Sequence, residues 1–156
     1  MIKINQNLLQ EIIFKARIST RRRMNYNFHE KASDTLQRMI NVMIPGTYVQ
    51  PHKHENPGKR EVFIILKGKA WVIEFDDMGN INESYLMDPS LENYAVEIPP
   101  STWHMIIPVE ESVFYELKDG PYDPNSDKVF ASWAPPETSP GKTTFVEEVL
   151  KSMKSK

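Results

Sequence analysis

The sequence predicts a mainly β protein in which short antiparallel strands form a sandwich or a barrel. Segments rich in Val, Ile, Phe, Tyr and Trp recur between about residues 23 and 118. Turn-forming pairs such as Pro45-Gly46, Lys67-Gly68 and Asp119-Gly120 separate these segments, and no helical pattern interrupts them. The expected strands cover residues 23–29, 36–44, 61–66, 70–76, 81–87, 94–98, 104–107 and 112–117.

Helices are expected only at the two ends of the chain. Before Ser19, apolar residues recur at helical spacing, and polar residues occupy the other side. The apolar set is Leu8, Leu9, Ile12 and Ile13. A Pro-rich run over 121–140 predicts an extended arm whose aromatics Tyr122, Phe130 and Trp133 need cover, followed by a short terminal helix. We therefore expect one domain made of an N-terminal helix (1–20), a β-barrel (21–120) and a C-terminal arm with a helix (121–156).

The first expected strand carries a stripe of polar side chains on one face, because side chains alternate along extended backbone. The stripe consists of Arg23, Asn25, Asn27 and His29. Such a stripe is either the solvated side of an edge strand or the wall of a ligand pocket. In a pocket, the guanidinium suits a carboxylate or phosphate, and the amides and the imidazole can read hydroxyls. Arg38 would add a second cation, so these five residues are the predicted substrate-binding set.

Composition excludes several functional classes. The 156 residues suit one domain, and the net charge of −2 provides no basic field for nucleic acid. The absence of cysteine excludes disulfides and Cys-ligated zinc, so His and carboxylates must hold any metal. The N-terminus lacks an apolar signal core, and no window approaches the roughly 18 apolar residues of a membrane span. We expect a cytoplasmic protein that has neither a nucleic-acid partner nor a membrane span.

Two of the four histidines stand in the stretch "PHKHENPGKRE". His52 and His54 are two residues apart, so on extended backbone both imidazoles project from the same face. A turn over 56–59 would bring Glu61 back beside them, and His104 would join from a distant strand. Three imidazoles and one carboxylate form a compact site for a divalent first-row metal such as zinc, iron, manganese or nickel. The alternative is that His52 and His54 are exposed turn residues.

The spacing of these residues resembles the two motifs of the cupin superfamily. The first match runs through Gly46, His52, His54, Glu61 and Gly68, and the second through Pro99, Ser101 and His104. The gap from His54 to Glu61 is longer than the commonest cupin spacing, and Ser101 stands where the family usually has Gly. The resemblance implies a cupin-type double-stranded β-helix, or jelly-roll barrel, with the matched His and Glu residues as metal ligands and a homodimer as the assembly.

A narrower resemblance covers roughly residues 21–137. The series "RMNYNFH", "QRMINVMIPGTYVQPHKH", "GKAWVIEFDDMGNI", "EIPPSTWH", "YELKDGPYDP" and "KVFASWAPPE" is similar to the WbuC family of cupin-fold metalloproteins. That family is associated with bacterial O-antigen and lipopolysaccharide gene clusters. The resemblance implies a metal-binding cupin whose ligand is a carbohydrate or a sugar nucleotide.

Three functions fit this sequence, and none of them comes with an assigned catalytic residue. The first is a metalloenzyme that isomerises, epimerises, hydrolyses or oxygenates a carbohydrate. The second is a non-catalytic module that binds or senses a sugar through the same pocket. The third is a metal-free sugar epimerase, which would not need the HxH pair. Glu116 and Lys118 share a strand face, so they either enter the barrel mouth or form a solvated ion pair.

Overall fold

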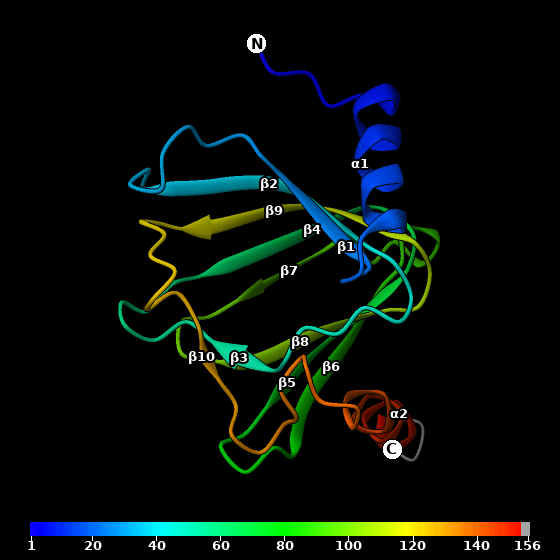
Figure 1. Ribbon diagram of the computed structural model, residues 1–156, viewed down its shortest axis with the longest axis vertical. Helices are drawn as coiled ribbons and strands as arrows, with labels where there is room; N and C mark the ends of the chain where they lie inside the picture. Colours follow the sequence, from blue (N-terminus) through cyan, green and yellow to red (C-terminus); the bar gives the residue numbers. More distant parts are fainter. Residues whose placement is uncertain (154–156) are drawn as a thin grey trace.

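The computed structural model describes residues 1–153, in which two five-stranded antiparallel sheets lie in two layers and one helix lies toward each end of the chain (Figure 1). The elements are α1 (Gln6–Ile18), β1 (Arg23–Asn27), β2 (Leu36–Met43), β3 (His52–Lys53), β4 (Glu61–Lys67), β5 (Ala70–Phe75), β6 (Ile81–Met87), the 3-10 helix η1 (Pro89–Leu91), β7 (Ala95–Ile98), β8 (Trp103–Pro108), β9 (Ser112–Asp119), β10 (Val129–Phe130) and α2 (Lys142–Met153). The predicted mainly β fold class is confirmed.

The chain repeatedly crosses from one sheet to the other. One sheet has the order β1-β2-β9-β4-β7, and the other has the order β10-β3-β8-β5-β6. Consecutive strands β2, β3 and β4 alternate between the sheets, as do β7, β8 and β9, which is the connectivity of a jelly roll. Segments near residue 54 and residue 104 thereby meet inside the same barrel.

The core lies between the two sheets because each strand turns its apolar face inward. Along β4 the buried residues alternate with more exposed ones, and they are Glu61, Phe63 and Ile65. Phe63 packs edge-on against Phe114 of β9 in this core. Glu61 thus continues an apolar stripe, and this buried carboxylate marks one end of the core.

The helix α1 covers the outer face of the first sheet. Its N-cap is Asn5, whose side chain accepts a hydrogen bond from the backbone N–H of Leu8 at 3.1 Å. Its buried face, including Ile12 and Ile13, packs against apolar side chains of β2 and β9. Ser19 is the C-cap, so the helix ends where the sequence predicts.

The C-terminal arm packs along the second sheet and ends in α2, whose Val149 is buried against it. Trp133 lies against Phe75 at a ring separation of 5.1 Å, and β10 adds a strand to the sheet by pairing with β3. The expectation of cover is wrong for Tyr122 and Phe130, which are 43% and 50% exposed. Both line a cavity that is partly open to solvent.

The predicted division of the chain at residues 20 and 120 stays a prediction. Residues 154–156 of the expected arm lie outside the described residues. Within the described part, the arm contributes both a strand and cavity-lining side chains. Barrel and arm therefore build the cavity together.

Gly68, in the tight connection between β4 and β5, is expected to be intolerant of a side chain. Its φ is +87°, and a Cβ there would lie 2.2 Å from the carbonyl oxygen of Glu111. We expect Gly68→Ala to lower the free energy of unfolding by about 3 kcal/mol, since left-handed strain and backbone displacement add. Urea denaturation measures this. Gly141→Ala is the control, because its nearest contact would be Ser139 Oγ at 3.4 Å; equal stability of the two variants would contradict the prediction.

Candidate metal centre

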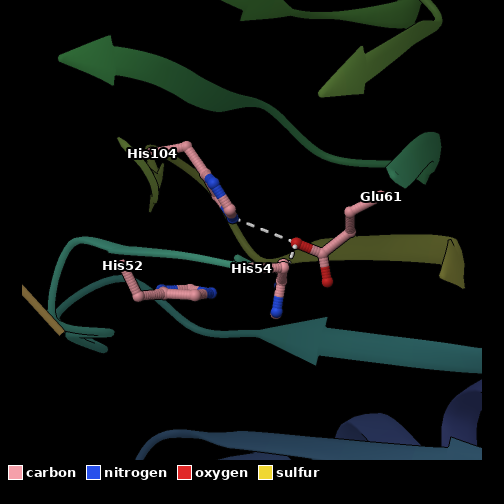
Figure 2. A group of neighbouring side chains, drawn as sticks. All are labelled: His52, His54, Glu61 and His104. Carbon is pink, nitrogen blue, oxygen red and sulfur yellow. Dashed lines mark hydrogen bonds and ion pairs between the residues drawn. The ribbon is translucent and has the colours of Figure 1, made fainter. Parts of the chain in front are cut away.

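Four side chains that are distant in sequence form one buried cluster: His52, His54, Glu61 and His104 (Figure 2). Each offers one ligand atom, and these atoms all lie within 4.8 Å of one another. No residue of the four is more than 4% exposed. The structure therefore brings together all four residues that the sequence predicts as metal ligands.

Both sheets contribute to the cluster. His52 of β3 is the register partner of His104 of β8, and directly opposite residues in an antiparallel pair share a face. His54 follows two residues after His52, and Glu61 enters from β4 in the opposite sheet. Glu55 is not part of the cluster and pairs with Lys53 at 2.9 Å. The cluster thus connects the two layers at one end of the core.

The three imidazoles are oriented through their Nδ1 atoms. His52 Nδ1 lies 3.0 Å from the carbonyl oxygen of Gln50, and His104 Nδ1 lies 2.9 Å from that of Thr102. His54 Nδ1 contacts the backbone carbonyl oxygen of Asp127. A carbonyl oxygen only accepts, so Nδ1 carries the proton in each ring and donates it. A neutral imidazole has one N–H, which leaves each Nε2 with a free lone pair, as in metal-ligating histidines.

The Nε2 atoms of two of these imidazoles face the carboxylate of Glu61, whose oxygens also accept hydrogen bonds. Nε2 of His104 lies 3.0 Å from Oε2 of Glu61, and Nε2 of His54 lies 3.4 Å from the same oxygen. Nε2 of His52 is buried and has no hydrogen-bond partner. Acceptor atoms that face one another need a proton or a metal cation between them. Three nitrogens and one carboxylate oxygen are a donor set suited to a divalent first-row metal, so the residues fit the metal that the cupin pattern implies.

The pKa values of two members agree with this reading. Burial lowers the pKa of His52 well below its ordinary value, which keeps the ring neutral, as ligation requires. For Glu61, burial raises the pKa, but hydrogen bonding to the imidazoles of His104 and His54 and the charge of Lys118 outweigh it. This effect requires a proton, in the place a metal would take, between the facing atoms. The pKa of Glu61 is therefore well below its ordinary value, and the carboxylate stays charged.

The cluster opens into a cavity of about 660 Å³. His52, Glu61 and His104 form part of its wall. The polar stripe that the sequence predicts, Arg23, Asn25, Asn27 and His29, lines the same cavity, although β1 ends at Asn27. These four residues are thus brought together with the metal cluster. Their role in ligand binding stays a prediction.

Arg38 is not brought into the cavity. Alternation along β2 turns Gln37, Met39 and Asn41 to the cavity wall, which puts Arg38 on the opposite face of the strand. Its guanidinium donates to the carbonyl oxygen of Phe28 at 3.0 Å. Arg38 therefore supports the turn of the chain between β1 and β2.

Several members of the polar stripe already have partners. Arg23 forms an ion pair with Glu137 at 2.6 Å and donates to the carbonyl oxygen of Tyr48 at 2.9 Å. Asn25 Nδ2 donates to Asn27 Oδ1 at 2.7 Å. A ligand would exchange hydrogen bonds with these amides, whereas the guanidinium of Arg23 is largely committed.

Glu116 is a cavity residue whose place the sequence leaves open. It is buried and accepts a hydrogen bond from Asn41 Nδ2 at 2.7 Å. Burial and the charge of Glu61 raise the pKa of Glu116 to about 8. The two carboxyl groups of this site thus have pKa values pushed in opposite directions. The alternation of residues along β9 indicated in the sequence that Glu116 could face the barrel interior. The charge state of Glu116, however, depends on Glu61, which lies on another strand.

The sequence analysis did not identify Asp127 as a residue of the site. Its carboxylate is buried between two lysines, with Lys59 Nζ at 2.8 Å and Lys118 Nζ at 2.6 Å. Its backbone carbonyl oxygen is the partner of His54 Nδ1. The Lys59–Asp127–Lys118 triad thereby fixes the loop that orients one of the metal-cluster histidines. Lys118 pairs with Asp127, and not with Glu116 in the solvated pair considered above.

Within residues 1–153, none of the helices has the length and apolar character needed to cross a membrane.

Comparison with known proteins gives a family and a fold. A family model described as "Domain of unknown function (DUF6016)" matches residues 4–87. No curated protein matches the sequence.

Similar solved structures include the capsular polysaccharide assembling protein CapF from Staphylococcus aureus, with a TM-score of 0.55 and 22% identity over 68% of this chain and 28% of that one. SPY1581 from Streptococcus pyogenes, of unknown function, has a TM-score of 0.55 and 19% identity over 79% and 91%. KdgF from Halomonas has a TM-score of 0.51 and 17% identity over 66% and 82%. The chain spans less than a third of CapF. CapF and KdgF have cupin folds, so these similarities show a cupin fold.

Proposed function

The chain belongs to the DUF6016 family of domains of unknown function, and we propose that it is a divalent-metal cupin whose ligand is a carbohydrate or a sugar nucleotide. One observation supports the metal: three buried imidazoles, each held at Nδ1 by a backbone carbonyl group, and the carboxylate of Glu61 each offer one ligand atom, and these atoms lie within 4.8 Å of one another. The cavity beside the cluster supports a small polar ligand, because its wall carries amides and charged groups. We favour a metalloenzyme over a binding module.

The roles of the residues follow from their positions. His52, His54, Glu61 and His104 would hold the metal, which would supply a Lewis acid and an acidified water or hydroxyl group. The amides of Asn25 and Asn27 would exchange their mutual hydrogen bond for bonds to ligand hydroxyls. Glu116, held by Asn41, presents a second carboxyl group to the same cavity.

The cellular setting is the finer part of the proposal. The resemblance to the WbuC family supports a role in O-antigen or lipopolysaccharide biosynthesis, and the structural similarity to CapF, a capsular polysaccharide assembling protein, supports a carbohydrate ligand. We further propose a homodimer, as carried over from cupins, and a cytoplasmic location.

Metal content tests the proposal directly. Untagged protein purified without added metal is expected to carry near-stoichiometric divalent metal by elemental analysis, because four donors of the preferred type converge. The His52→Ala/His104→Ala double variant is expected to lose it. His29→Ala is the matched control, since His29 is the one remaining histidine of the chain and lies outside the cluster. Equal metal in the wild type and the double variant would refute the metal site.

A ligand screen separates the functions. Nucleotide sugars and sugar acids are tested by thermal shift before and after chelation, and stabilising ligands are tested for turnover. We expect stabilisation that disappears when the metal is removed. Stabilisation that survives complete chelation would favour the metal-free epimerase, and a stabilising ligand that is never converted would favour the binding module.

A further inference from the structure

Lys128 contributes an ammonium group to the cavity wall. It stands between Asp127 and β10, and it is half-buried. Within residues 1–153, no hydrogen bond or ion pair holds its ammonium group. The polar stripe and the metal cluster do not include it. An ammonium in this setting is available to a bound molecule.

The register of β10 explains why Lys128 faces the metal cluster. Val129 pairs with Lys53, and Phe130 pairs with His52. Extending this antiparallel register by one residue puts Lys128 opposite His54, and opposite residues share a face. The ring of Phe130 lies 6.1 Å from that of His52 on this same face. Lys128 is also near enough for its charge to lower the pKa of His52.

The other cations of the cavity wall differ from Lys128 in being paired. Arg23 and Arg21 share Glu137, at 2.6 and 3.7 Å. Lys118 forms its ion pair with Asp127. Burial lowers the pKa of Lys128 and outweighs the nearby charges of Glu61, Glu116 and Asp127, none of which forms an ion pair with it among the described residues. An anion bound beside it would offset the cost of burying this charge.

We propose that Lys128 binds the carboxylate of a sugar acid beside the metal cluster; this deepens the proposed function and rests on it. A carboxylate is favoured over a phosphate or diphosphate by the donors present. A single ammonium is a point charge, while phosphate sites commonly add a helix N-terminus or a free guanidinium fork. Among the described cavity residues, none lies in the first turn of a helix, and Arg23 is already paired.

Calorimetric titration of the metal-loaded protein tests this proposal. The probes are matched pairs: glucuronate with glucose, galacturonate with galactose, and mannuronate with mannose. At least one acid is expected to bind about tenfold or more tightly than its neutral partner, since a hydrogen bond to a charged group is strong. Lys128→Met is expected to weaken binding of that acid about tenfold or more, with metal content unchanged. Lys128→Arg should restore part of the affinity, and Lys3→Met, an exposed lysine, should change nothing.

Several outcomes would overturn the proposal. The proposal is wrong if none of the acids binds the metal-loaded wild type. It is also wrong if Lys128→Met binds the acid as tightly as the wild type does. Loss of metal from Lys128→Met would instead assign the lysine to the structure of the centre. Glucose 1-phosphate and UDP-glucose are tested in the same way. If only these two probes bind in a manner that depends on Lys128, the group bound by Lys128 is a phosphate and not a carboxylate. A wild type that carries no metal refutes the metal site itself, so the two failures are distinguishable.

Discussion

Replacing Asp127 with alanine is expected to lower the free energy of unfolding by about 3–5 kcal/mol, the usual cost of breaking a buried ion pair from one side. Asp127 is 3% exposed and is the shared counter-ion of Lys59 and Lys118. Without it, two buried ammonium groups lose their partner at once, and both must be expelled or deprotonated. Urea denaturation at neutral pH measures the loss.

The stabilisation by Asp127 has a pH dependence of known sign. Burial raises the pKa of Asp127, but the charge of Lys118 and the hydrogen bonds from both lysines outweigh it, so the pKa lies below its ordinary value of 3.8. Its contribution is therefore complete above that value and is lost as the pH falls through the lower pKa of the folded state. The difference in stability between wild type and Asp127→Ala should shrink in strong acid.

Asp123→Ala is the matched control for Asp127→Ala. Asp123 lies in the same loop, is exposed, and its carboxylate accepts hydrogen bonds from the backbone N–H and the side chain of Asn125 in a local turn. We expect a loss below about 1 kcal/mol for this variant. If Asp127→Ala were as stable as Asp123→Ala, the triad would contribute no net stability, and the orientation of His54 would need another cause.

The strands and the histidine pair were predictable because their signals are local. Alternation of apolar residues and the turn-forming glycines fixed most strands to within one or two residues, and the expected strand 81–87 coincides with β6. Alternation also put His52 and His54 on one face. The short strands β3 and β10 were missed because two residues are too few to show a period.

The charges of the site were less predictable, because they depend on residues that only folding brings together. His54 and the carbonyl group of Asp127 are 73 positions apart, and nothing in the sequence links them. The ion pair of Lys118 with Asp127, and the lack of an ion pair at Lys128 among the described residues, depend on the conformation of the loop before β10. The orientation of Arg38 away from the cavity could have been predicted from the sequence, because strand alternation puts it on the opposite face from Met39 and Asn41.

Replacing Glu61 tests whether this residue ligates the metal or is simply a buried carboxylate. Glu61→Gln keeps the shape of the side chain and removes its charge, so we expect the affinity for Zn²⁺ to fall by more than about 100-fold, beyond the 10–100-fold typical of residues that only support a ligand. The reason is electrostatic: the carboxylate is the one anionic member of the described cluster. Competition with a chromophoric chelator measures the affinity.

Glu116→Gln is the matched control for Glu61→Gln, because it alters the neighbouring buried carboxyl group. In the protein without metal, burial and the charge of Glu61 raise the pKa of Glu116 to about 8, which favours its neutral form, and glutamine can still accept from Asn41. We expect Zn²⁺ affinity within about threefold of wild type, as for a change that leaves the local charge nearly constant. Equal losses in both variants would mean that cavity polarity, and not ligation, sets the affinity. An unchanged affinity in Glu61→Gln would mean that the three imidazoles and water hold the metal, as in catalytic zinc sites.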